Sequence, residues 1–152
     1  MTTLKEQLHA QIKETMRARD QKKLDTLRLI SAAIKQVEID ERIDVDDTRM
    51  LAILDKMTKQ RHESIGHYKT AERDDLIAQE EFELAVIRDY MPEPLPEVEI
   101  IDLITQAFAL LQVKQISDMG KIMAYLKPLM QGRADMTKVS ALVKTKMNAA
   151  LG

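Results

Sequence analysis

The chain has 152 residues, of which 45% are apolar, so it can bury a proper core and does not have the composition of a disordered protein. It contains no cysteine, which excludes disulfides and thiolate metal sites. The net charge of −2 argues against a nucleic-acid partner for the chain as a whole, but from Val113 onward seven basic residues accompany only two acidic ones, a balance of +5.

The N-terminal segment, Met-Thr-Thr-Leu-Lys-Glu, lacks the apolar core of a signal peptide. No apolar run of the sequence is long enough to span a bilayer. From these two observations we expect a cytoplasmic protein.

Apolar residues at helical spacing predict four helices before residue 92. The first carries Leu4, Leu8, Ile12 and Met16 on one face, and the second carries Leu24, Leu27, Ile30, Ile34 and Val37. Asp44, Asp46 and Asp47 supply cap chemistry for a long third helix with an inward stripe of Met50, Ile53, Leu54, Met57, Ile65 and Tyr68. Arg73-Asp74-Asp75 is expected to cap a fourth helix that ends near Met91.

Three prolines, Pro92, Pro94 and Pro96, then interrupt the helical pattern. Proline removes backbone donors and pushes its predecessor out of the helical region, so this segment is the best domain boundary of the chain. A fifth helix is predicted over 97–111, and no strand-like alternation occurs anywhere. We therefore predict an all-α fold, with an N-terminal four-helix region over 1–91, a proline-rich hinge over 92–96 and a small three-helix C-terminal domain over 97–152.

The last two helices are predicted to form a tight hairpin. Ser117 or Asp118 can cap the first helix, and Gly132 stands where a left-handed C-terminal residue belongs. Asp135 can cap the second helix, and Pro128 should bend or shorten the first one. The apolar residues of the first helix, Met119, Ile122, Met123, Leu126, Leu129 and Met130, are expected to pack inward.

The outward face of this hairpin carries the candidate binding residues. Small residues between cations allow a phosphodiester backbone to approach closely, although a plain solvated face is the simpler interpretation of any single lysine. Lys146 projects near the apolar side and is expected to extend from the core edge instead. Arg133, in the turn, is expected to be sterically free. The candidates for nucleic-acid contact are Lys121, Lys127, Arg133, Lys138 and Lys144.

Arg61 lies at the centre of the apolar stripe of the third helix. A buried arginine needs a carboxylate, which Glu80, Glu83 or Asp89 could provide; alternatively Arg61 binds an anion in an inter-domain groove. His62 and His67 diverge by about 140° on a helix and cannot share a metal as an i, i+4 pair could. No glycine-rich phosphate loop and no amidase-like nucleophile is present, so we expect no metal, no cofactor and no catalytic residue.

The chain resembles the YqeY-like family, whose hallmark is a small helical domain shared with the tail of the B subunit of glutamine-dependent aminoacyl-tRNA amidotransferases. The resemblance is carried by Asp118-Met119-Gly120-Lys121-Ile122-Met123, Gly132-Arg133-Ala134-Asp135, Leu27-Arg28-Leu29-Ile30-Ser31-Ala32-Ala33-Ile34-Lys35, Lys59-Gln60-Arg61, Ala71-Glu72-Arg73-Asp74-Asp75-Leu76 and Tyr90-Met91-Pro92. The run 125–128 departs from it, because it is bulkier than the matching run of the amidotransferase tails.

The resemblance implies two helical domains and a tail that helps to hold tRNA, while amide transfer takes place on other parts of the amidotransferase. It also carries a family label, carbon–nitrogen ligation with glutamine as amide donor, which does not by itself establish catalysis. We therefore expect a non-catalytic accessory protein that binds tRNA or a tRNA-modifying enzyme. The alternatives are a helical protein-interaction adaptor without nucleic-acid binding, and an amidotransferase component.

Overall fold

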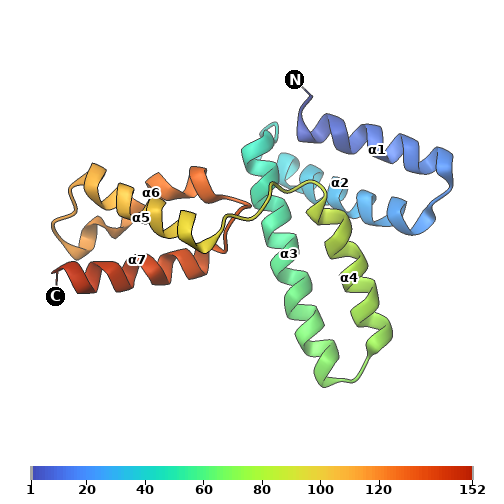
Figure 1. Ribbon diagram of the computed structural model, residues 1–152. Coiled ribbons are helices and arrows are strands. Elements are labelled where there is room, and N and C mark those ends of the chain that lie inside the picture. Colours follow the sequence, from blue (N-terminus) through green and yellow to red (C-terminus); the bar gives the residue numbers. More distant parts are fainter. Residues whose placement is uncertain (1, 152) are drawn as a thin grey trace. The chain divides into compact units, whose positions relative to one another are not determined.

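The computed structural model describes residues 2–151, and within that range all regular structure is helical: seven α-helices and one short 3₁₀-helix (Figure 1). The prediction of an all-α fold is confirmed. Within residues 2–151, no helix has the length and apolar character needed to cross a membrane. The chain folds into two compact units, one ending at Met91 and the other beginning at Pro92.

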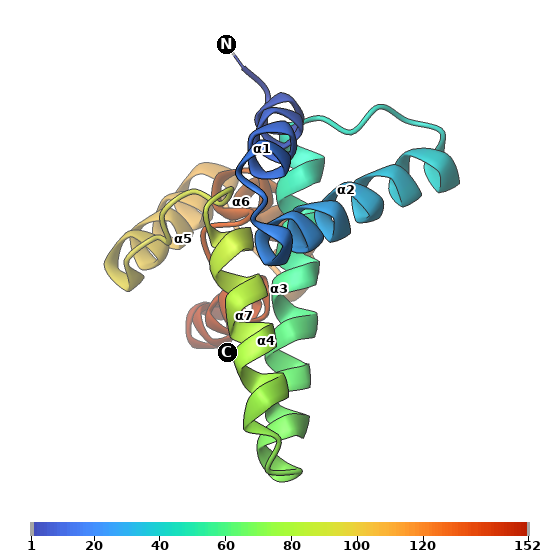
Figure 2. The same ribbon diagram turned by 90° about the vertical axis from the view of Figure 1, so that its right-hand side faces the viewer.

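The first unit consists of α1 (Leu4–Ala18), α2 (Gln21–Glu41), α3 (Asp47–Thr70) and α4 (Asp74–Arg88). The two helices α3 and α4 form an antiparallel pair joined by a short turn (Figure 1). In both views α1 and α2 lie at the end of this pair that is opposite to the turn (Figure 2). Both α1 and α2 pack on α3, and α2 also packs on α4, so one core serves all four helices.

Short polar side chains set the helix starts of this unit. Thr3 accepts a hydrogen bond from the backbone of Glu6, whose carboxylate accepts one from the backbone of Thr3, a reciprocal cap for α1. Asp46 accepts from the Arg49 backbone at 2.8 Å and caps α3. The expected side-chain cap of α4 is not formed, because the residue at the cap position is Arg73, whose guanidinium has no acceptor atom and instead pairs with the Asp75 carboxylate.

The core of the first unit contains most of the residues of the predicted stripes. Leu27, Ile30, Met50 and Leu54 are fully buried. Met16 is an exception, since it lies near the C-terminal end of α1, 51% exposed, where no neighbouring helix covers it. The expected end of α4 near Met91 is also too late, because the helix stops at Arg88.

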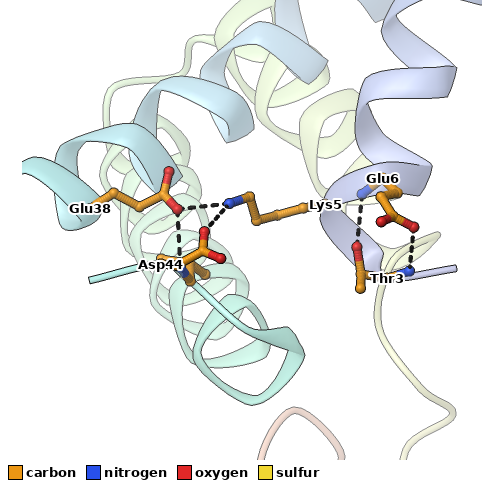
Figure 3. A network of polar contacts seen from close by, with 6 residues as sticks. Thr3, Lys5, Glu6, Glu38 and Asp44 are labelled. Atoms are coloured by element: carbon orange, nitrogen blue, oxygen red, sulfur yellow. Dashed lines mark hydrogen bonds and ion pairs between the residues drawn. The ribbon is translucent and has the colours of Figure 1, made fainter. Parts of the chain in front are cut away.

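An ion-pair cluster joins the start of α1 to the end of α2 and the loop after it (Figure 3). The Lys5 ammonium donates to Glu38 at 2.7 Å and to Asp44 at 2.8 Å. Glu38 also accepts from the backbone nitrogen of Val45, which is buried in the core. These contacts fix the 42–46 loop against two helices. The hydrogen bonds to Asp44 and then Glu38 raise the pKa of Lys5, and the bond to Lys5 lowers the pKa of Asp44.

The second unit consists of α5 (Glu97–Leu111), a 3₁₀-helix (Ile116–Asp118), α6 (Met119–Met130) and α7 (Met136–Leu151). Helix α6 packs against both α5 and α7. The core contains residues of all three helices and one of the proline segment: Leu95, Ile104, Ala107, Ile122, Leu126, Met130, Val139, Val143 and Met147. Pro128 lies in the last turn of α6, and the helix ends two residues after it.

The proline segment is attached to the second unit at two points. The backbone nitrogen of Leu95 donates to the Arg133 carbonyl at 2.8 Å, and the Arg133 Nε donates to the Glu93 carbonyl at 3.0 Å. The Leu95 side chain is buried in the core of that unit. Met91, by contrast, packs in the first unit, where its sulfur lies 3.8 Å from the Thr58 hydroxyl. Only Pro92 therefore lies between the two anchored stretches.

Candidate nucleic-acid interface

The turn between α6 and α7 has the chemistry that a tight helical hairpin requires. Gly132 adopts a φ of 78°, in the left-handed region where a side chain would be strained. The Asp135 carboxylate accepts from the Thr137 backbone at 3.0 Å, and the Asp135 carbonyl accepts from Val139 at 3.0 Å. Asp135 therefore caps α7. The turn fixes the direction in which the second helix leaves, and so the positions of its lysines.

The start of α6 differs from the expectation of a Ser117 or Asp118 cap. Residues 116–118 form a 3₁₀ turn, and Asp118 itself has helical dihedral angles. Its carboxylate turns back and accepts hydrogen bonds from the backbone nitrogens of Lys114, at 3.0 Å, and Gln115, at 3.2 Å. These backbone hydrogen bonds, that from Lys114 first, lower the pKa of Asp118. Asp118 thus holds the 112–115 loop instead of capping the helix.

The four candidate lysines are all exposed on the hairpin. Lys121 is paired weakly with Asp118, at 3.8 Å, and its side chain is 75% exposed. Lys127, Lys138 and Lys144 are exposed and form no ion pair with any residue of 2–151. On each helix, the residues between the two lysines include the buried ones: Ile122 and Leu126 on α6, and Val139 and Val143 on α7. The core therefore turns the lysines toward solvent.

Leu129 is the one member of the expected inward stripe of α6 that is clearly exposed, at 42%. It lines a surface groove of about 370 Å³ with Leu95 and Leu103 of the same unit. The helix turns by about 100° per residue, so the buried residues Ile122 and Met130 lie about 40° to either side of Leu126 on the wheel. Leu129 lies about 60° from Leu126 and falls just outside this buried arc. The sequence pattern alone does not reveal where this arc ends.

Arg133 is not the free turn residue that we expected. Its Nε donates to the Glu93 carbonyl, and its own carbonyl accepts from Leu95. It also shares the groove beside Leu129 with the carboxylates of Glu99 and Asp102, which disfavour an anion there. Lys146 lies at the core edge, with its ammonium 5.4 Å from the centre of the Phe108 ring and 3.5 Å from the Thr105 hydroxyl.

In the first unit, Arg61 has a carboxylate partner. Its Nε lies 3.2 Å from a Glu83 oxygen, and its Nη1 donates to the Met57 carbonyl at 3.2 Å. Both charged side chains are nearly buried, at 13% and 10% exposure. His62 and His67 are exposed on α3, and among residues 2–151 no cluster of three or more His, Asp or Glu side chains could hold a metal.

The sequence interpretation missed the two contacts that position this hairpin. One is the tether from Arg133 to the proline segment, and the other is the turn held by Asp118. A signal for the first was present, because Leu95 is an apolar residue between two prolines and such a residue needs a core to enter. No signal pointed to the second, since an aspartate before a helix is most simply a cap.

Comparison with known proteins identifies a family and several relatives that this chain resembles in sequence. The profile of a family described as Yqey-like protein matches residues 5–147. A relative from Pyrenophora tritici-repentis is 29% identical over 125 residues, covering 79% of this chain and 69% of that protein. A second relative, from Eremothecium gossypii, is 36% identical over 105 residues, covering 68% of this chain and 57% of that protein. A third, from Saccharomyces cerevisiae, is 32% identical over 97 residues, covering 63% of this chain and 52% of that protein. All three are named "Altered inheritance of mitochondria protein 41, mitochondrial". For the last two relatives, the matched part of the chain spans little more than half of their length.

These names contradict the expected cytoplasmic location, because they place the relatives in mitochondria. The prediction was wrong because it excluded only secretory signals and membrane spans. Mitochondrial targeting segments are amphipathic and rich in arginine, so the lack of an apolar leader carries no information about them. The family, in contrast, is shown over nearly the whole sequence. The chain belongs to the Yqey-like protein family.

Proposed function

We propose that this protein is a non-catalytic accessory protein that binds tRNA, or an enzyme acting on tRNA, through the lysines of the α6–α7 hairpin. One observation carries the proposal: Lys121, Lys127, Lys138 and Lys144 are all exposed on a hairpin whose apolar side chains are used by its own core. The part of the chain from Val113 onward has a net charge of +5, whereas residues 92–112 include four acidic residues and no basic one. Charge is thus separated within a single small unit.

Exposed lysines suit a polyanion that is recognised mainly by its phosphates. Each lysine that neutralises a phosphate releases a counterion, and this release supplies most of the affinity of sequence-independent binding. Arg133 has a different role in this proposal. Because its Nε and its carbonyl hold the proline segment, it positions the turn, and only its remaining guanidinium nitrogens can reach a phosphate.

We also propose that the two compact units are separate domains, four helices before the prolines and three after them. The support is that each unit has its own apolar cluster, including Leu27 and Leu54 in the first and Ile122 and Val143 in the second. Expression of residues 1–91 and 92–152 as separate chains tests this. Each should unfold cooperatively by circular dichroism, and a second fragment without a transition would refute independence.

Fluorescence anisotropy with labelled total tRNA tests the binding proposal. A charge-reversal variant, Lys121→Glu/Lys127→Glu/Lys138→Glu/Lys144→Glu, should lose binding that the parent shows at low salt. The matched control reverses four exposed lysines of the first unit, Lys13, Lys35, Lys56 and Lys69, and should keep it. Absence of binding by the parent at low salt would remove the proposal.

A second candidate function is a protein-interaction adaptor, which is favoured by the apolar exposure of α5. Val98, Ile101 and Leu110 are 70%, 48% and 64% exposed, on a helix without a basic residue. A pull-down with and without nuclease separates the two candidates. A partner that is kept after nuclease and moderate salt, and lost with Ile101→Glu, favours the adaptor; a partner lost with nuclease favours RNA.

A further inference from the structure

A groove of the first unit, remote in sequence from the hairpin lysines, has the volume of a small-ligand site and a mostly polar lining. It lies between α1, the start of α2 and the end of α4, and has a volume of about 530 Å³. Pockets for small ligands have volumes of roughly 300–1,000 Å³. Its apolar wall is formed by Ala10 and Val86, and its polar groups are Gln7, Gln11, Lys23, Asp89 and Tyr90.

Tyr90 provides the most informative polar atom of this groove. Its ring belongs to the core, and the residue is only 8% exposed. The phenol oxygen has no hydrogen-bond partner within residues 2–151. Every fully enclosed side-chain nitrogen or oxygen in that range does have a partner, so this oxygen is accessible to solvent, and the groove is the opening that Tyr90 lines. Burial, and to a lesser degree the nearby Asp89 charge, raises the pKa of Tyr90 to about 12, so the phenol remains a hydrogen-bond donor at any physiological pH.

Two opposite charges line the same groove without neutralising each other. Lys23 is half-buried at the start of α2, and Asp89 directly follows α4. Neither forms an ion pair with any residue of 2–151, and in particular they do not pair with each other. A groove with a cation, a separate anion and an unpartnered phenol is matched by a ligand that carries both charges.

We propose that this groove binds a small zwitterion of the α-amino acid class. The ligand carboxylate lies toward Lys23 and Tyr90, which donate to it, and the ligand ammonium lies toward Asp89. The side-chain amides of Gln7 and Gln11 are left to contact the rest of the ligand. A simple anion such as phosphate is disfavoured by Asp89, and a simple cation is disfavoured by Lys23. This site is independent of the proposed RNA contact, and either can be refuted alone.

Nuclear magnetic resonance titration of the full chain, labelled with ¹⁵N, tests the site directly. The standard L-α-amino acids are added one at a time to about 10 mM, above the millimolar dissociation constants expected for ligands of this size. At least one should shift the amide signals of Gln7, Gln11, Lys23 and Asp89. Its N-acetyl derivative and its carboxamide derivative, each lacking one charge, should bind about 10-fold more weakly or not at all.

Three conservative variants assign the contacts. Tyr90→Phe removes only the hydroxyl, and Lys23→Met and Asp89→Asn each remove one charge. Each should lower the affinity for the amino acid about 10-fold while the spectrum remains that of a folded protein. Lys13→Met and Asp74→Asn, exposed changes on α1 and α4 away from the groove, serve as controls and should bind as the parent does.

Three results would overturn the proposal. The first is the absence of groove shifts with every amino acid at the highest concentration. The second is equal binding of the free, acetylated and amidated forms. The third is binding that shifts the groove signals but is unaffected by all three variants, since the ligand would then not use the groups that define the site.

Discussion

The Arg61–Glu83 pair allows a sharp test of how the first unit is held together. Arg61 lies on α3 and Glu83 on α4, and these two helices form the most extensive helix–helix contact of that unit. The two side chains are 13% and 10% exposed. Arg61→Met leaves the Glu83 carboxylate nearly buried beside Gln79 alone, whose amide lies 3.4 Å away. Glu83→Leu leaves the guanidinium with only the Met57 carbonyl.

The expected cost follows from this burial. Removing one partner of a fully buried pair destabilises a protein by about 3–5 kcal/mol, because an uncompensated charge is left inside. Since both side chains retain some solvent contact, we expect about 2–3 kcal/mol for each single variant. In contrast, Arg61→Met/Glu83→Leu removes both charges and should lie within about 1 kcal/mol of the parent, or above it. The coupling between the two sites is therefore large.

Equilibrium urea unfolding followed by circular dichroism measures these values. With a slope of about 1–2 kcal/mol/M, each single variant should move the midpoint down by about 1–3 M. The control is Lys59→Met, which removes a half-exposed ammonium from a looser i, i+4 pair with Asp55 at 3.6 Å and should cost less than about 0.5 kcal/mol. If the double variant is less stable than either single one, the pair is not the reason for the cost and the reasoning fails.

Three further predictions concern the helix ends and the core. Gly132→Ala should destabilise the second unit by about 1–2 kcal/mol in urea unfolding, because its φ is 78°; a neutral effect would show that the turn can rearrange. Leu126→Ala should cost about 2–5 kcal/mol in the same assay, since Leu126 is fully buried, whereas Leu129→Ala should cost well under half as much, and equal costs would contradict the exposed position of Leu129. The pKa of Asp44 is lowered and that of Lys5 is raised, so their mutual stabilisation should be lost as the pH falls below the usual Asp value of 3.8 and again as it rises above the usual Lys value of 10.5. The stability deficit of Lys5→Met should therefore be greatest between about pH 5 and pH 10, and a deficit that does not change with pH would rule out this ion pair as its source.

Much of the fold follows from spacing and caps. The periodic apolar residues predicted the helices of both units, and the three prolines lie at the start of the second compact unit. Gly132 and Asp135 predicted the turn of the last hairpin, because few residues tolerate a left-handed backbone and few can cap a helix. These features are local, and local chemistry is what a single sequence displays most directly.

The errors concern positions where a distant segment decides the outcome. Met16 and Leu129 lie on apolar stripes, but each is exposed because the stripe extends beyond the helix that covers it. Asp118 turns back to the preceding loop, and Arg133 is bound by a segment 40 residues earlier in the chain. The groove around Tyr90 lies between three helices, and no pattern in the sequence predicts that Lys23 and Asp89 line the same groove.

The salt dependence of tRNA binding is the most direct test of the central claim that the hairpin lysines contact phosphates. If all four are engaged, the affinity of the parent should fall about 100-fold between roughly 50 and 200 mM salt, and each Lys→Ala change at residue 121, 127, 138 or 144 should reduce the logarithmic slope by about 1. Changes at Lys13 and Lys69 should leave the slope unaltered. An affinity that is insensitive to salt, or a slope that the four hairpin variants do not change, would contradict the account.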